Sequence, residues 1–281
     1  MERPAALEGR TTLTDEEVAQ LESADQARAD RAPRAGDPGT YNAFWTDRGR
    51  RSGQTSMVVD PPDGKFPPLT AVGQQAQKSR ARGADSWEDR HLWERCITRG
   101  GMPNAMFPRA YNNNAQIFQT PEYVVILLEE IHETRIIPLD GRAHLPQQVR
   151  QWMGDSRGSW EQDTLVVDTT NIAGKVSALQ PWANFNSIDG SQQTLHTVER
   201  FRRVDANTIS YTITVNDPQM YTRPWTVEFP MEKTAELLYE YACHEGNYGM
   251  FGILTGGRAD EKVNPEAASS GQPGAPERRP R

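Results

Sequence analysis

The chain has 281 residues, a formal net charge of −7 and a mean hydropathy of −0.75. This length is enough for one large domain or two small ones with a sizeable core. The negative charge argues against a dedicated nucleic-acid binder, because phosphate contacts need clustered Lys and Arg. No apolar run is long enough to cross a bilayer, and residues 1–10 lack the apolar region of a signal peptide.

The first part of the chain, residues 1–35, is predicted to be a helical arm. Thr14 and Glu17 have the spacing of a capping box, and the following residues favour a helix with few apolar side chains. Residues 36–110 are expected to form a Pro-rich and helical wrap on the core, with helices at 70–82 and 86–96. Within this wrap Trp45 is interpreted as an anchor, or alternatively as part of a lid over a pocket.

Residues 111–256 show the alternating apolar pattern of half-buried strands, separated by short polar turns such as Asp140-Gly141. The predicted strands are 115–120, 123–131, 134–139, 157–161, 164–170, 195–204, 208–216, 225–233 and 237–244. Eight or more antiparallel strands joined by hairpins indicate a mainly β fold, best explained by a lipocalin-like meander barrel. A two-sheet β-sandwich is the alternative. Residues 257–281 are nearly free of apolar side chains and are expected to be a disordered tail.

Two cysteines, Cys96 and Cys243, are compatible with one disulfide or with two buried thiols. CxxC and zinc-finger spacings are absent. If the protein is exported, these residues are the available pair, and a bridge would join the predicted helix 86–96 to the last predicted strand.

Several runs carry a resemblance: YNNNAQIFQTPEYVVILLEEIHETRIIPLDGRAHLP, GDSRGSWEQDTLVVDTTN, LHTVERFRRVD and YEYACHEGNYG. With them, the chain from 2 to 258 resembles a family of bacterial proteins from soil genomes. Members usually begin with a secretion signal, so the resemblance implies a secreted or periplasmic protein with a trimmed start; a cytoplasmic location is the alternative. The family has no established activity, so the resemblance implies no catalytic residues. The run WEQDTLVVDTTN is also similar to strand patterns of lipocalin-like barrels.

Histidines in or beside predicted strands, with acidic and basic neighbours, are the candidates for chemistry. The candidate catalytic residues are Glu130, His132, His144, His196 and His244. The candidate ligand contacts are Arg142, Arg200, Glu245, Trp45 and Tyr211. Because buried ionisable groups need partners, at least three of the histidines are expected to border one cavity, beside Glu130 and Arg142.

Three interpretations of these histidines remain open. They could be structural residues, an acid–base site for a lyase, isomerase or hydrolase, or ligands of zinc, copper or iron. No HExxH, GxSxG or phosphate-binding loop occurs, and the sequence does not identify a cofactor. The expected partner is a small molecule, either a substrate or the cargo of a non-catalytic carrier. A carrier would have an apolar pocket with the histidines outside it.

Overall fold

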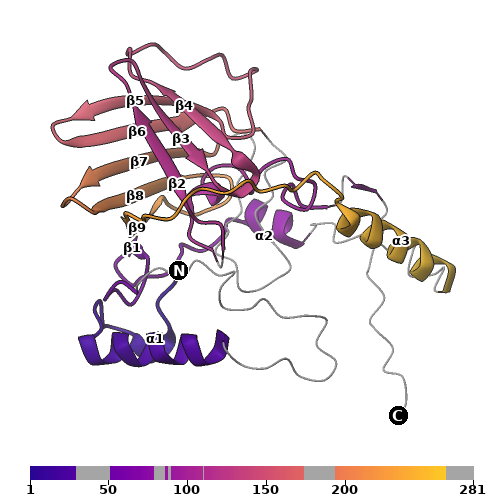
Figure 1. Ribbon diagram of the computed structural model, residues 1–281, viewed down its shortest axis with the longest axis horizontal. Coiled ribbons are helices and arrows are strands. Elements are labelled where there is room, and N and C mark those ends of the chain that lie inside the picture. The colour runs from indigo at the N-terminus through magenta and orange to yellow at the C-terminus, as the bar shows by residue number, and fades with distance from the viewer. Residues whose placement is uncertain (30–50, 79–85, 88–89, 110, 174–193, 264–281) are drawn as a thin grey trace.

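The computed structural model describes residues 1–29, 51–78, 86–87, 90–109, 111–173 and 194–263. In this part of the chain the protein is mainly β, with two antiparallel sheets and few helices (Figure 1). The mainly β fold class is therefore confirmed. Trp45 lies outside the described residues.

The larger sheet has six strands in the order β1-β9-β8-β7-β6-β5. Its strands are β1 (Val58–Asp60), β5 (Asp155–Glu161), β6 (Thr164–Thr170), β7 (His196–Arg203), β8 (Thr208–Asn216) and β9 (Trp225–Glu232). From β5 to β9 each strand pairs with the next along the chain, as the alternating sequence predicted. The segment predicted to be an external wrap contributes β1, which pairs with β9.

The smaller sheet contains β2 (Ala115–Gln119), β3 (Tyr123–Leu128) and β4 (Thr134–Pro138). Figure 1 shows it lying across one face of the six-stranded sheet. Alternate residues of both sheets point into the core between them, including Ile126 of β3, Ile137 of β4, Tyr211 of β8 and Trp225 of β9. At Gly158 of β5 an added Cβ would lie 2.9 Å from the Ile137 Cγ2 atom, so glycine permits the close approach of β4.

The described strands do not close into a barrel. The six-stranded sheet ends at β1 and β5, and β4 approaches β5 without backbone pairing. A two-sheet, sandwich-like arrangement is compatible with this topology.

A buried ion pair joins the two sheets through their packed faces. The Arg135 guanidinium of β4 donates to the Glu199 carboxylate of β7, with an Nη1–Oε1 distance of 2.8 Å. The Tyr211 hydroxyl also donates to Glu199, at 2.9 Å, and the Ser156 hydroxyl accepts from Arg135 at 3.3 Å. Both charged side chains are almost fully buried, at 1% and 0% exposure.

The helices are α1 (Asp15–Ala29), α2 (Ala71–Lys78) and α3 (Tyr248–Val263), with short 3-10 turns at Ala5–Leu7, Asn104–Met106 and Glu130–His132. The predicted capping box is confirmed at α1. The Thr14 hydroxyl accepts from the Glu17 backbone N–H, and the Glu17 carboxylate accepts from the Thr14 N–H. No helix in the described part of the chain is long and apolar enough to cross a membrane.

Three predicted elements differ from the structure. Residues 237–244 are not a strand, and the outer edge of β9 pairs instead with β1, at Thr226 and Val227. The described residues of 86–96 form turns rather than a helix. The expected disordered tail begins too early, because α3 continues through residues 257–263; residues 264–281 lie outside the described part.

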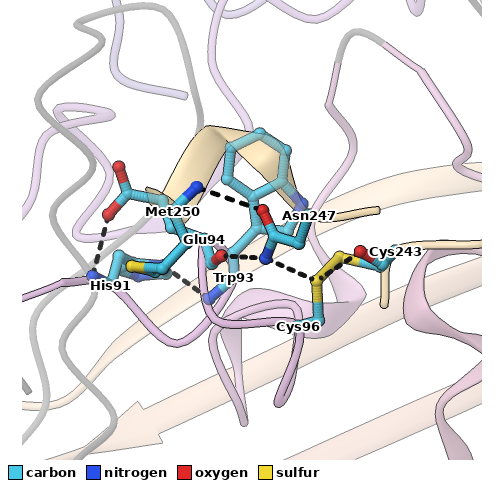
Figure 2. Close-up of a disulfide and its surroundings, with 7 residues drawn as sticks. All are labelled: His91, Trp93, Glu94, Cys96, Cys243, Asn247 and Met250. Carbon is cyan, nitrogen blue, oxygen red and sulfur yellow. Dashed lines mark hydrogen bonds between the residues drawn. A yellow bond between two sulfur atoms is a disulfide. The ribbon is translucent and has the colours of Figure 1, made fainter. Parts of the chain in front are cut away.

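A disulfide between Cys96 and Cys243 fixes the segment that leads into α3 (Figure 2). Beside it the Asn247 amide donates to the Glu94 carbonyl oxygen at 3.0 Å, and its Oδ1 atom accepts from the Met250 backbone N–H. The sequence allowed either a disulfide or two buried thiols, and the structure contains the disulfide. It joins a turn, rather than a helix, to a segment without strand structure.

Candidate functional site

One carboxylate on the outer face of the six-stranded sheet holds two histidines. Asp168 of β6 and His196 of β7 lie on the same face because Asp168 pairs with Val198, two residues beyond His196. The His196 Nε2 atom is 2.7 Å from Asp168 Oδ2, and the His144 Nε2 atom is 2.8 Å from Asp168 Oδ1. The result is a His144–Asp168–His196 cluster.

His144 reaches this face from the segment that follows β4. The segment turns at Gly141, which has a positive φ of 70°, and the Asp140 carboxylate accepts from the Arg142 backbone N–H. Asp155, at the start of β5, then fixes the imidazole: its Oδ2 atom lies 2.9 Å from His144 Nδ1.

Asp155 is itself held by several donors. Its Oδ2 atom accepts from the Leu145 backbone N–H at 2.8 Å, and its Oδ1 atom accepts from Arg157 Nη1 at 2.6 Å. The Asp155 side chain is 4% exposed, whereas the His144 side chain is 28% exposed. The His144 ring is therefore positioned by a buried carboxylate on one side and by Asp168 on the other.

The number of hydrogen bonds in this cluster indicates which imidazole nitrogens need a proton. Ionised carboxylates only accept hydrogen bonds, and a neutral imidazole has a single N–H. Both nitrogens of His144 face carboxylate oxygens, so satisfying both contacts requires the doubly protonated ring. His196 needs only the Nε2 proton for its contact with Asp168, and its Nδ1 atom has no hydrogen-bond partner among the described residues.

The contacts shift the pKa values of Asp168 and His196 in opposite directions. The hydrogen bond to Asp168 raises the pKa of His196 above its ordinary value, although partial burial opposes this. Partial burial by itself would raise the pKa of Asp168, but hydrogen bonds and charge from His196 and His144 outweigh it and lower that pKa. The two groups thus stabilise each other as an ion pair.

This pair predicts a defined pH dependence of stability. The His196 contribution is complete below its ordinary pKa of 6.5 and is lost as pH rises through its raised folded value. The Asp168 contribution is present above 3.8 and is lost as pH falls through its lowered folded value. We expect Asp168→Asn to reduce the free energy of unfolding most near about pH 5 and least near about pH 9. Because both side chains are more than a third exposed, the effect at pH 5 should stay below about 1 kcal/mol.

Urea denaturation of the wild type and Asp168→Asn at both pH values measures this effect. Asp140→Asn is a matched control, since Asp140 is exposed and pairs only locally with Arg142. An equal loss at the two pH values in Asp168→Asn would contradict the proposed ion pair.

A pocket of about 220 Å³ adjoins the cluster. It is lined mainly by polar groups: Gln147, Arg150, Thr170, Asn171, Thr194, Leu195 and His196. His196 therefore belongs both to the cluster and to the pocket wall. Arg150 is a cationic residue of this lining, and within the described part of the chain its guanidinium makes a long 3.4 Å hydrogen bond to the Ile172 carbonyl oxygen.

The structure brings together two of the four predicted catalytic histidines. His144 and His196 share Asp168, and His196 lines the pocket. His132 and His244 are exposed and are not part of this cluster. The expectation of three histidines around one cavity is therefore wrong for this pocket. Strand β3 ends at Leu128, before Glu130 and His132, which lie in a 3-10 turn, and His132 has a positive φ of 40°. The alternation of a strand, which predicted that Glu130 and His132 share one face, therefore does not apply to them.

Glu130 is buried in a different place from the pocket. It forms an ion pair with Arg99 at 2.5 Å, with both side chains at most 3% exposed. Burial raises the pKa of Glu130, while the charges of Arg99 and Arg109 partly oppose the rise. This candidate catalytic carboxylate is therefore paired with a buried arginine and is not among the residues that line the pocket.

The predicted ligand contacts are also dispersed. Arg142 and Arg200 are exposed and pair with Asp140 and Glu161. Glu245 is exposed, and Tyr211 is fully buried between the sheets, where it donates to Glu199. None of these four side chains lines the pocket.

No protein-family model, curated protein or solved structure matches this chain. Among the described residues no group of three or more His, Cys, Asp or Glu side chains has the arrangement of a metal site. Inference about function therefore rests on the geometry of the cluster and the pocket.

Sequence reasoning missed Asp168, Asp155 and Arg150. Asp168 carries a usable signal, because a charged residue interrupts the apolar run TLVV in a predicted strand. Its partner His196 could be recognised only from the register between β6 and β7, which determines the residues that lie side by side on one face of the sheet. Arg150 lies in a connecting segment, where no periodicity marks a side chain that lines a pocket.

Proposed function

We propose that this protein binds a small polar organic molecule in the pocket and that His196 transfers a proton to or from it. The observation that carries the proposal is the double role of His196. Its Nε2 atom is fixed by Asp168, and the same residue lines the pocket. A carboxylate that holds one imidazole nitrogen and leaves the other available is a common arrangement for general acid–base catalysis.

The raised pKa of His196 supports a role as a proton donor or acceptor near neutral pH. The reaction classes that fit are proton transfer steps of lyases, isomerases and hydrolases. A non-catalytic carrier is the alternative. The sequence-based criterion for a carrier was an apolar pocket with the histidines outside, whereas this pocket is mainly polar and includes His196.

We also propose that the protein works in an oxidising compartment, in agreement with the family resemblance of the sequence. The supporting observation is the disulfide between Cys96 and Cys243, since such bonds persist mainly in secreted and periplasmic proteins.

The proton-transfer proposal is tested by incubating the protein with small carbonyl and hydroxy compounds in D2O. Proton NMR detects both exchange of acidic C–H protons and formation of products. For a compound that reacts, we expect His196→Gln to lower the rate about 100-fold or more, because loss of a general acid–base group typically costs 10²–10⁴. Asp168→Asn should lower it as well, since Asp168 orients the ring.

His132→Gln is the matched control, because His132 is exposed and separate from the cluster. It should leave the rate unchanged. A reaction that proceeds equally well in His196→Gln would refute the proposed role. Saturable binding at His196 without exchange or turnover of any tested compound would favour the carrier.

A further inference from the structure

Arg150 is the feature of the pocket that the proton-transfer proposal does not use. It is the cationic residue among the described residues lining the pocket, and none of the described carboxylates forms an ion pair with it. Its guanidinium offers five N–H donors, of which one makes the long contact to Ile172. Most of its donors are thus available to a ligand.

The nearby carboxylates are already satisfied by other groups. Asp155 is bound by Arg157 and His144, and Asp168 is bound by His144 and His196. Within the described part of the chain no carboxylate pairs with Arg150, which lies at the concave surface of the pocket. An arginine in this position favours an anion with two oxygens in one plane, which a guanidinium binds in a bidentate manner.

The volume of the pocket and its lining residues other than Arg150 restrict which anions can bind there. About 220 Å³ is the liquid volume of roughly seven water molecules, so the ligand has few non-hydrogen atoms. Gln147 and Thr170 also line the pocket, and a side-chain amide and a hydroxyl suit a hydroxyl or carbonyl group of a ligand. Two carboxylates of the adjoining cluster disfavour a highly charged anion.

From these observations we infer that the pocket recognises a small organic carboxylate, with Arg150 binding the carboxylate group and His196 facing the rest of the molecule. The inference rests on the proposed function for the role of His196, but the binding role of Arg150 stands on the pocket alone. It makes Arg150 a determinant of specificity, distinct from the residue that transfers the proton.

The test is a binding titration followed by NMR of the labelled full chain, with acetate, lactate and succinate as probes. Acetamide is the uncharged counterpart of acetate, and inorganic phosphate is the competing anion. We expect acetate and lactate to shift the backbone signals of Thr170, Asn171 and His196, the dianion succinate to bind more weakly, and acetamide to leave the signals in place. Arg150→Gln should weaken carboxylate binding about ten-fold or more, because a hydrogen-bonded charge is lost, and Arg150→Lys should weaken it less.

Arg200→Gln is the matched control, since Arg200 is an exposed arginine on the same strand as His196 but outside the pocket. It should bind the probes as the wild type does. Equal binding by the wild type and Arg150→Gln would overturn the inference, as would tighter binding of phosphate or equal binding of acetamide. Unchanged NMR signals elsewhere in Arg150→Gln show that the variant is folded.

Failure of this inference can be separated from failure of the proposed function. Carboxylate binding that depends on Arg150, without any effect of His196→Gln on turnover, would overturn only the proton-transfer role. Turnover that depends on His196, with binding indifferent to Arg150, would overturn only the assignment of the ligand class.

Discussion

Arg135→Met is expected to lower the free energy of unfolding by about 3–5 kcal/mol, because it leaves the buried Glu199 carboxylate without its cation. Arg135 and Glu199 are almost fully buried and form two parallel hydrogen bonds across the interface between the sheets. Removing one partner of such a pair retains the desolvation cost of the other. Tyr211 alone donates a single hydrogen bond to Glu199 and cannot replace the guanidinium.

Burial and charge also shift the pKa values of Tyr211 and Arg135 in this network. The pKa of Tyr211 is raised well above its ordinary value by burial and then by the Glu199 charge. Glu199 outweighs the effect of burial on Arg135 and raises the pKa of that guanidinium. The guanidinium of Arg135 therefore keeps its positive charge in the core.

Urea denaturation measures the expected loss, with Arg200→Gln as the control. Arg200 also pairs with a glutamate, Glu161, but both side chains are about half exposed, so its loss should cost at most about 1 kcal/mol. Replacing both Arg135 and Glu199 with methionine should recover much of the stability, because no buried charge then remains. A loss below about 1 kcal/mol in Arg135→Met would show that the pair does not bear on stability as argued.

The second large effect is expected from removing the disulfide. Cys96 and Cys243 are separated by 147 residues, so the bond restricts a long loop of the unfolded chain. We expect the double variant Cys96→Ser/Cys243→Ser to lose about 2–5 kcal/mol of stability. The loss should be accompanied by faster hydrogen exchange around Asn247, which the bridge holds beside the Glu94 carbonyl (Figure 2).

Reduction of the wild-type protein under native conditions is the matched comparison, since it breaks the same bond without a substitution. Thiol titration of unfolded, unreduced protein should find no free thiol. Two titratable thiols would contradict the bridge. Stability that is unchanged in both the reduced and the double-variant protein would contradict its energetic role.

The strand pattern of the sheets was predictable because alternation is a local signal. In β8, for example, Tyr211, Ile213 and Val215 are buried and alternate with less buried residues, as the sequence indicates. Whether a sheet closes into a barrel, and which strands lie next to each other in it, depends on residues far apart in the sequence. The prediction of a strand at 237–244 was wrong, and a segment distant in the sequence, β1, pairs with the outer edge of β9 instead.

The candidate site was predictable only in part, for a related reason. His144 and His196 were identified as polar residues in a strand-rich region, but the predicted direction of His196 was inward. The structure places His196 on the outer face and its neighbour Glu199 in the core, because a single strand gives two parities and the sequence does not say which one is covered. The charges buried in the interior include Glu199, paired with Arg135, and Glu130, paired with Arg99.

The buried ion pair of the core has a consequence for the alignment of β7. A slip of one residue along this strand would turn Glu199 toward water, move His196 away from Asp168 and leave Arg135 buried without a partner. A shifted register of β7 is therefore strongly destabilised by the unpaired charges at the inner face, whereas the polar outer face would not disfavour it. The ion pair between the sheets therefore fixes the register of β7, and this register places His196 beside Asp168 on the opposite face of the sheet.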